Sequence, residues 1–360
     1  MIWGGEALDV KPPNPGDGPC SPSSMYHCYI RGNSILETIH MNLITKNDLS
    51  IHYNSFDTEW LGYPIWEKFP IKRSDVDYIK NATETYLGRL VPLTRLLIIL
   101  PDCEYMSMGE GLQFPSFKPN NPYVPEITAT VVIREKDKKQ THYLLGVSMY
   151  KSPWRDLPAM LVKRKSGLNG GPLCFNNLDQ NTAIDIHILA LEREQASALQ
   201  LIESVYSLPS QIFSDEGRSA YEKGVNTAEL ISHSLGGAID KYRKSIDGGW
   251  EGRLKSAGSS KMDLLERLHS RATIHYWTVV EKSLKILMDY VESIGSTPES
   301  VTGAKKRWES VLFKAARESY ILVCPNKTPR QMRAFALGWQ IIDSENRSKN
   351  QDTEKKEGNE

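Results

Sequence analysis

The sequence lacks a net charge, a long apolar run and the leader of a secreted protein. Its 360 residues contain 44 Lys or Arg and 44 Asp or Glu, so the whole chain has no positive field to attract nucleic acid. This excludes a DNA-binding protein that works by overall charge alone, but it leaves local basic patches open. No apolar stretch is long enough to span a bilayer, and the first six residues do not resemble a signal peptide. We therefore expect a cytoplasmic protein that does not enter a membrane.

The sequence also lacks the residue spacings of metal, disulfide and nucleotide sites. Its cysteines are odd in number, scattered and never arranged as C-x-x-C, which favours free thiols in a reducing compartment. No Walker loop or dinucleotide fingerprint is present, and the histidines show no metal-ligand spacing. We therefore expect no cofactor, no metal and no catalytic cluster. The five cysteines are Cys20, Cys28, Cys103, Cys174 and Cys324.

The apolar pattern divides the chain into parts of different structure. Residues 1–213 mix short strand-like and helix-like stretches, which predicts a mixed α/β domain with antiparallel hairpins. Residues 214–343 place apolar side chains three and four positions apart, which predicts four amphipathic helices packed as a four-helix bundle. Residues 344–360 are charged and polar, which predicts a disordered tail. The expected fold class is α+β.

Several elements of the first part can be located. The apolar residues from Ile35 to Ile44 predict a short buried helix after Asn33-Ser34. Residues 128–135 and 142–150 predict a β-hairpin with a charged loop between its strands. Apolar and polar residues alternate from Ile184 to Ile188, which predicts a half-buried strand. That strand runs into a polar turn, 192–197, which resembles a hairpin tip aimed at a partner.

Two helix starts in the second part are clear from capping residues. Thr297-Pro298-Glu299 combines a capping hydroxyl, a proline at the first turn and an acid beside the positive end of the helix dipole. Thr328-Pro329 predicts the next start in the same way. An uninterrupted apolar stripe from Met262 to Val291 predicts one helix before them. The aromatic residues on these stripes are expected to lie in the core.

A basic patch lies in the first part and admits two interpretations. Such a cluster is more often solvated surface than a phosphate contact, so the first interpretation is favoured and the second stays open. The patch consists of Lys151, Arg155, Lys163, Arg164 and Lys165.

One motif suggests an enzyme. His233-Ser234-Leu235-Gly236-Gly237 is similar to part of the nucleophile elbow of lipases, with Ser234 as nucleophile. That elbow needs a strand before the serine and a glycine two residues upstream, whereas position 232 is Ser and a helical stripe precedes it. Asp263 and either His269 or His275 could be named as partners, but they fall on a predicted helix. A serine hydrolase therefore stays a minor alternative.

An ordered series of segments resembles one known family, the large subunit (CasA) of the type I-E CRISPR surveillance complex Cascade. No single segment is specific, but their order over most of the chain supports the resemblance. The segments are Arg31-Gly32-Asn33-Ser34-Ile35-Leu36-Glu37-Thr38, Met41-Asn42-Leu43, Pro64-Ile65-Trp66-Glu67, Trp154-Arg155-Asp156-Leu157 and Glu194-Gln195-Ala196-Ser197.

The resemblance implies a non-catalytic subunit that recognises the short PAM tag of duplex DNA from the minor groove and opens the strands. By match to the family's wedge hairpin, Gln195 would be the wedge, Ala196 its small neighbour and Glu194 the residue before it. Gly4 and Gly5 would represent the family's glycine loop. Lys118 is the candidate for its groove-reading lysine.

The resemblance also implies partners. In the family the helical bundle meets the small subunits and the displaced DNA strand, and the large subunit helps to recruit the helicase–nuclease. The expected partners are therefore the crRNA-containing Cascade subunits, double-stranded target DNA and that effector.

The family's N-terminal portion has no counterpart in this sequence. If that portion normally completes the first domain, we expect exposed apolar surface here. A helical-bundle interaction protein without a nucleic-acid function remains a further alternative.

Overall fold

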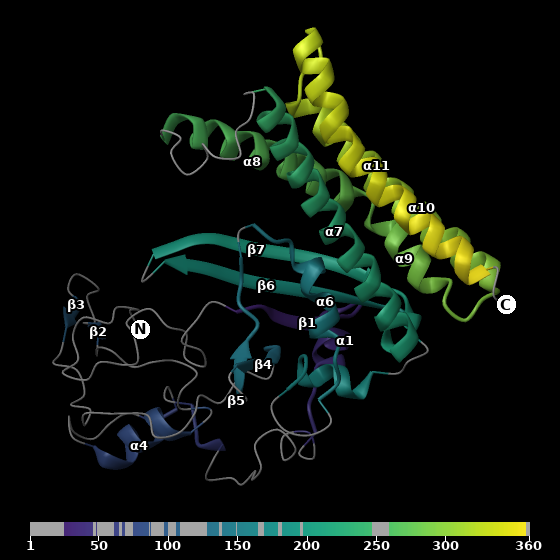
Figure 1. The fold of residues 1–360 in the computed structure, drawn as a ribbon. Helices are drawn as coiled ribbons and strands as arrows, with labels where there is room; N and C mark the ends of the chain where they lie inside the picture. Colours follow the sequence, from purple (N-terminus) through teal and green to yellow (C-terminus); the bar gives the residue numbers. More distant parts are fainter. Residues whose placement is uncertain are drawn as a thin grey trace. The chain divides into compact units, whose positions relative to one another are not determined.

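A computed structural model describes most of the chain and confirms the α+β class (Figure 1). The chain divides into two compact units, Met1–Leu208 and Pro209–Glu360, whereas the sequence placed the boundary after residue 213. The described residues are 25–45, 48, 61–64, 67–68, 75–85, 87, 97–99, 106–108, 128–136, 139–148, 150–164, 169–178, 182–194, 197–246 and 259–357.

The first unit contains a three-stranded antiparallel sheet. Its strands are β1 (His27–Arg31), β6 (Ile184–Glu194) and β7 (Ser197–Leu208), in the order β1-β6-β7. The predicted strand at 184–188 and its continuation into a hairpin are thus confirmed. Alternate residues of β6 are buried, because strand side chains point to opposite faces in turn. The fully buried Ile186 and Ile188 pair across the sheet with Ile30 and Cys28 of β1.

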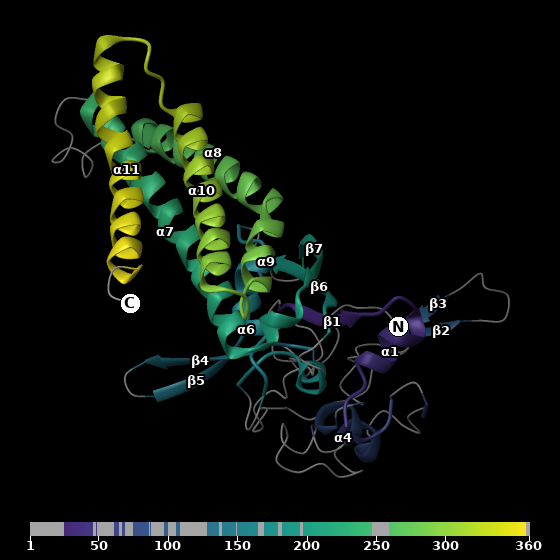
Figure 2. The ribbon, with the colours of Figure 1, turned by 90° about the vertical axis from the view of Figure 1, so that its right-hand side faces the viewer.

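Two smaller strand pairs belong to the same unit. The predicted hairpin near residues 128–150 is confirmed as β4 (Val131–Lys136) and β5 (Lys139–Leu144), which stand together in Figure 2. Lys136 pairs with Lys139, so the strands extend further into the charged segment than predicted. β2 (Leu97–Ile99) pairs with β3 (Met106–Met108). The described part of the unit also contains the short helices α4 (Val76–Glu84), η1 (Pro153–Asp156), α6 (Leu157–Met160) and η2 (Leu173–Asn177).

The predicted helix after Ser34 forms, but it is not buried. α1 (Ile35–Met41) has no buried residue, and its large apolar side chains face solvent. Its sequence specifies a helix locally, since Ser34 caps it and Glu37 reaches back to the Asn33 N–H. Burial also needs an element packed over these apolar side chains, and the described residues place none there.

The second unit is helical. Its elements are η3 (Ser210–Phe213), α7 (Asp215–Ile246), α8 (Ser259–Lys282), α9 (Leu284–Glu292), α10 (Pro298–Val323) and α11 (Pro329–Glu357). Thr297 caps α10 as predicted, and the Thr328 hydroxyl accepts from the Gln331 N–H at the start of α11. The continuous stripe from Met262 to Val291 is divided into α8 and α9 at Ser283. The helical backbone of α11 continues to Glu357, which differs from the predicted disordered tail.

α7 packs against each of α8, α9, α10 and α11, and α10 also contacts α8, α9 and α11. Aromatic residues fill these contacts, as predicted. The indole N–H of buried Trp308 donates to the Gly224 carbonyl at 3.1 Å, and the Tyr276 hydroxyl donates to the Ala228 carbonyl at 2.8 Å. Burying one such ring contributes roughly 1.5–3 kcal/mol, and these bonds remove the penalty of burying its polar atom.

The expected free thiols are confirmed for the cysteines that the structure describes. Cys28, Cys174 and Cys324 are unpaired and buried. Burial raises the pKa of Cys174 and of Cys324 to about 12. These thiols therefore stay protonated near neutral pH and act as small apolar side chains. Cys20 and Cys103 lie outside the described residues.

One glycine sets how closely two helices approach. A Cβ atom added to Gly338 of α11 would lie 2.6 Å from the Ala238 carbonyl oxygen of α7 and 2.1 Å from the Tyr320 hydroxyl. The α7–α11 contact therefore depends on the missing side chain.

We predict that Gly338→Ala lowers the free energy of unfolding by about 1–3 kcal/mol, because the added methyl group overpacks the contact. Gly237→Ala is the matched control, since nothing lies within 4 Å of its added Cβ on α7. We expect that control to stabilise the protein by about 0.5–1 kcal/mol through helix propensity. Denaturant unfolding followed by circular dichroism measures both, and equal effects of the two changes would contradict the packing argument.

Candidate nucleic-acid interface

The β6–β7 hairpin carries the candidate wedge. The two strands stay paired up to Glu194 and Ser197, the last pair of the register. Gln195 and Ala196, the two residues between them in the sequence, lie outside the described residues. Gly4, Gly5 and Lys118 also lie outside them. The structure therefore describes the support of the candidate site rather than its tip.

Packing on one face holds this hairpin in register. β6 has a hydrogen-bonded neighbour on each side, and the inward side chains Ile184, Ile186, Ile188 and Ala190 are all buried. A slip of one residue would turn those side chains to solvent, so the register is strongly specified. A bulge between Glu192 and Arg193 interrupts the ladder just before the tip. Bulges of this kind bend and twist a ribbon and so change the direction in which its end points.

Polar bonds tie the strands together on the opposite face. The His187 ring bonds the Tyr29 hydroxyl of β1 through one nitrogen and the Glu203 carboxylate of β7 through the other, the latter at 2.8 Å. The Ser207 hydroxyl donates to Asp185 at 2.6 Å. These bonds link all three strands and add to the stiffness of the hairpin.

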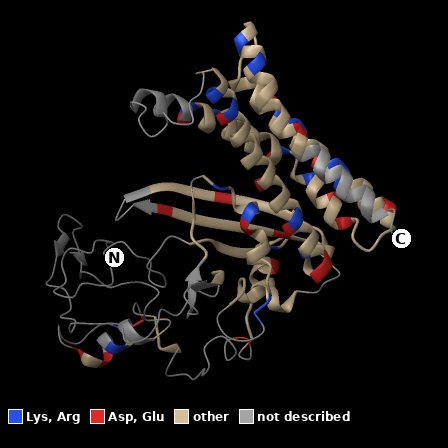
Figure 3. Cartoon of the chain, in the orientation of Figure 1, with Lys and Arg blue, Asp and Glu red and all other residues tan. Residues whose placement is uncertain are grey.

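The hairpin is negatively charged, so it does not attract DNA by its own charge. Residues 184–208 contain four carboxylates and one guanidinium. Figure 3 shows acidic residues along the described part of the ribbon. Any attraction of phosphate would therefore have to come from other elements.

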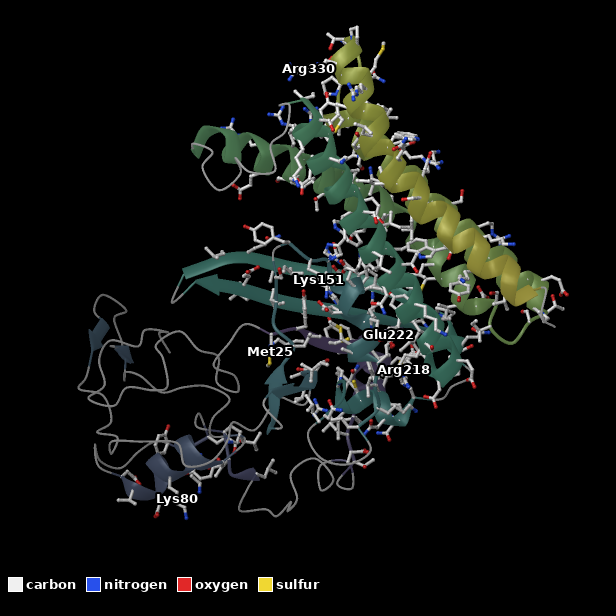
Figure 4. All side chains as sticks on the ribbon, viewed as in Figure 1. Met25, Lys80, Lys151, Arg218, Glu222 and Arg330 are labelled. Carbon is white, nitrogen blue, oxygen red and sulfur yellow. The ribbon has the colours of Figure 1, made fainter. Side chains whose placement is uncertain are left out.

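The predicted basic patch at 151–165 is mostly engaged within the protein. Arg164 is buried and donates to the carbonyls of Ala129 and Gly170, so it is neither solvated surface nor a phosphate contact. Lys151, labelled in Figure 4, pairs with Asp156. Lys163 donates to the Leu178 carbonyl at 3.3 Å. Lys165 lies outside the described residues.

A different basic cluster lies in the helical unit, and the sequence analysis missed it. The Tyr242 hydroxyl donates to the Pro325 carbonyl, which joins the end of α7 to the segment before α11. Each joined stretch, 241–246 and 324–336, has three cations and no carboxylate. Arg330 marks this end in Figure 4. Each triplet is visible in the sequence, but only the fold brings them together. The cluster consists of Lys241, Arg243, Lys244, Lys327, Arg330 and Arg333.

The structure does not provide the geometry of the hydrolase alternative. Ser234 lies inside the continuous helix α7, so no strand-to-helix bend exposes its hydroxyl. His269 bonds Asp240 at 2.8 Å, and His275 bonds the Ser319 hydroxyl at 2.9 Å. Both histidines thus have other partners, and the side chain of Asp263 lies outside the described set.

Within the described part of the chain, no group of three or more metal-binding side chains gathers. Among the same residues, no helix combines the length and apolarity needed to cross a membrane.

Comparison with known proteins decides the family. Residues 7–319 match the family described as CRISPR-associated protein Cse1. The chain belongs to the Cse1 family. A curated relative, the CRISPR-associated protein CasA/Cse1 of Thermus thermophilus, is 24% identical over 232 residues. That match covers 60% of this chain and 42% of the relative, so it spans less than half of the relative's length.

Solved Cse1 structures share the fold. CasA of Thermus thermophilus superposes with a TM-score of 0.61 at 19% identity, over 90% of this chain and 65% of the other. Cse1 of Acidimicrobium ferrooxidans gives 0.59 at 10% identity, over 90% and 63%. A structure described as a CRISPR RNA-guided surveillance complex gives 0.52 at 16%, over 90% and 61%.

Several family-like segments have structural roles in this chain. In the segment 31–38, Ser34 and Glu37 cap α1, and the Thr38 hydroxyl accepts from the Gly32 N–H. In the segment 154–157, Trp154 and Leu157 are fully buried. These motifs therefore identify the Cse1 fold rather than its binding site.

We predict that a fluorophosphonate probe does not label the native protein at Ser234, because Ser234 lies inside the continuous helix α7 and not at a strand-to-helix elbow. Mass spectrometry of the treated chain, compared with Ser234→Ala, measures this. Stoichiometric labelling that the substitution abolishes would restore the hydrolase alternative.

Proposed function

We propose that this chain is the non-catalytic large subunit of a cytoplasmic type I-E CRISPR surveillance complex. In this role it recognises PAM in duplex DNA from the minor groove and starts R-loop formation. Its partners are the crRNA-containing subunits, including the small subunit, the target DNA and the helicase–nuclease. Membership of the Cse1 family supports the assembly, and the β6–β7 hairpin carries the argument for strand opening.

The mechanical argument starts from the hairpin register. A side chain that enters a base stack must withstand the unstacking cost, a few kcal/mol per step. A loosely held loop would yield instead of separating the bases. β6 lies between two paired strands and buries one whole face, so a load on its end is carried by the packed sheet. The proposed wedge is Gln195, with Ala196 as the small neighbour that avoids a clash.

The chemistry of the minor groove explains why the protein would read the PAM and the guide RNA would read the rest of the target. The minor groove presents a degenerate pattern of donors and acceptors, which suits a short and permissive PAM. Guide pairing then supplies sequence specificity, and the new heteroduplex offsets the cost of opening. Gly4, Gly5 and Lys118 remain the proposed groove contacts.

The helical unit provides the complementary charge. We assign the basic cluster at the α7–α11 end to the phosphates of the displaced strand, because the hairpin itself is acidic. Its five long helices would act as a four-helix bundle in which α8 and α9 form one bent member. The basic ends of α7 and α11 are tied by the Tyr242–Pro325 bond, so they would meet the strand as one surface.

We predict that Gln195→Ala in a reconstituted complex slows R-loop formation at least tenfold while duplex binding changes less than about threefold. The physical reason is that the wedge acts during opening, whereas phosphate and groove contacts hold the closed duplex. Permanganate footprinting measures opening, and filter binding with a mismatched guide measures duplex affinity.

Gln200→Ala is the matched control, because Gln200 is an exposed glutamine on the same hairpin that pairs with Glu192 within the strands and is not in the turn. It should open DNA at the wild-type rate. A wild-type opening rate for Gln195→Ala would contradict the wedge assignment.

We also predict that Glu194→Gln raises duplex affinity about twofold to fivefold at low salt, because it removes a carboxylate beside the phosphates. The gain should fade at high salt as the charge is screened. Glu203→Gln, on the same strand pair but far from the tip, controls for the overall charge of the hairpin. Equal gains for the two variants would place the DNA elsewhere.

A further inference from the structure

Helix α1 presents apolar side chains that nothing covers in the described part of the structure. Ile35 is 82% exposed, Leu36 78%, Ile39 56% and Leu43, just beyond the helix, 61%. Single exposed apolar residues are ordinary on protein surfaces, but a contiguous group marks an interaction site. Ile35 and Ile39 are four positions apart, so they lie on one side of the helix. Leu36 widens this surface, which we call the α1 surface: Ile35, Leu36, Ile39 and Leu43.

The α1 surface is rigid, because side-chain hydrogen bonds hold helix α1 at both of its ends. At its start, the Asn33 N–H donates to Glu37 at 2.7 Å and the Gly32 N–H donates to the Thr38 hydroxyl at 2.9 Å. At its end, Asn42 exchanges two bonds with Ile30 of β1, its side chain accepting from the N–H and donating to the carbonyl. A seven-residue helix is too short to persist without such support. The chain thus uses several side chains to hold an apolar helix in solvent.

The lengths of the relatives indicate what covers this surface. Solved Cse1 structures accommodate 90% or more of this chain, yet this chain covers only 63–65% of three of them. A Cse1 protein therefore contains about a third of polypeptide that this sequence does not match. An uncovered apolar surface on the shared fold is where such a part would gain most free energy by packing.

We propose that the α1 surface is the docking site for a polypeptide segment equivalent to the part of Cse1 proteins that this chain does not match. The contact is apolar, and the segment buries Ile35, Leu36, Ile39 and Leu43. The same segment can belong to the same polypeptide or to a separate subunit, since the surface is preformed in either case. This proposal concerns assembly of the subunit, so it stands or falls independently of the proposed DNA function.

The test joins the part of Thermus thermophilus CasA/Cse1 that this chain does not match to this full chain through a flexible linker. The linker raises the effective concentration and so compensates for sequence divergence. Hydrogen exchange of the amides at 39–43 is then compared between the fused and unfused chains. We expect exchange to slow at least tenfold on fusion, because docking suppresses local opening of α1. The double variant Leu36→Glu and Ile39→Glu should abolish the slowing.

Ile274→Glu is the control, since Ile274 on α8 is also largely exposed but belongs to the helical unit. It should leave the slowing intact. Because Leu36 and Ile39 are exposed, the double variant should keep the helical circular dichroism of the parent chain. Adding the same Thermus segment as a separate polypeptide distinguishes docking between chains from docking within one.

Two results would overturn the proposal. The first is unchanged exchange at 39–43 in the fusion, or slowing that survives the double variant. The second is a dimer of the unfused chain that protects these amides and that the double variant disperses, because the occupant would then be a second copy.

Discussion

The register of β6 is the constraint on which the rest of the account depends. Four inward side chains of this strand are buried, and strand pairing fixes β1 on one edge and β7 on the other. Because side chains alternate along a strand, the register cannot shift by one residue without exposing this entire set. The same register that closes the core therefore determines where the end of the hairpin lies. The course of the two strands up to Glu194 and Ser197 thus follows from burial far from that end.

The two units differ in charge: the hairpin of the first unit is acidic, and one end of the helical unit is basic. The hairpin has an excess of carboxylates, while the ends of α7 and α11 gather six cations without a carboxylate in the same stretches. With a net charge of zero, the chain can only bind nucleic acid through such local asymmetry. A wedge that enters a stack does not need a positive charge, and phosphate contacts do not need a particular hairpin register. Under the proposed function, separating these tasks would allow each unit to satisfy its own packing requirements.

Much of the fold could be predicted from sequence, because local chemistry dictates it. Alternation located β6, and the Thr–Pro pairs located the starts of α10 and α11. What could not be predicted depends on contacts between distant residues. The sequence favoured a surface position for Arg164, but its buried guanidinium donates to the carbonyls of Gly170 and of Ala129, which lies on another segment. The sequence predicted that α1 is buried, but a pattern of apolar residues does not indicate whether another element packs over them.

The candidate site was predicted only through resemblance to a family. A glutamine in a polar turn has no chemistry that identifies a wedge, and the segments that identified the family mostly cap helices or fill the core. The break of the second helix at Ser283 and the helical continuation of α11 had no clear signal, because both preserve the local pattern around them. The basic cluster was missed for a further reason, since its halves are far apart in the sequence and come together only where α7 and α11 pack in the fold.

The most direct test of the central claim is the fluorescence of 2-aminopurine placed in the first base pair beyond the PAM. The complex would carry a guide mismatched at its first positions, so that guide pairing cannot open the duplex. If a rigid hairpin separates the strands, fluorescence should rise on binding even with this guide. A rise that occurs only with a matched guide would show that pairing, and not the hairpin, opens the DNA.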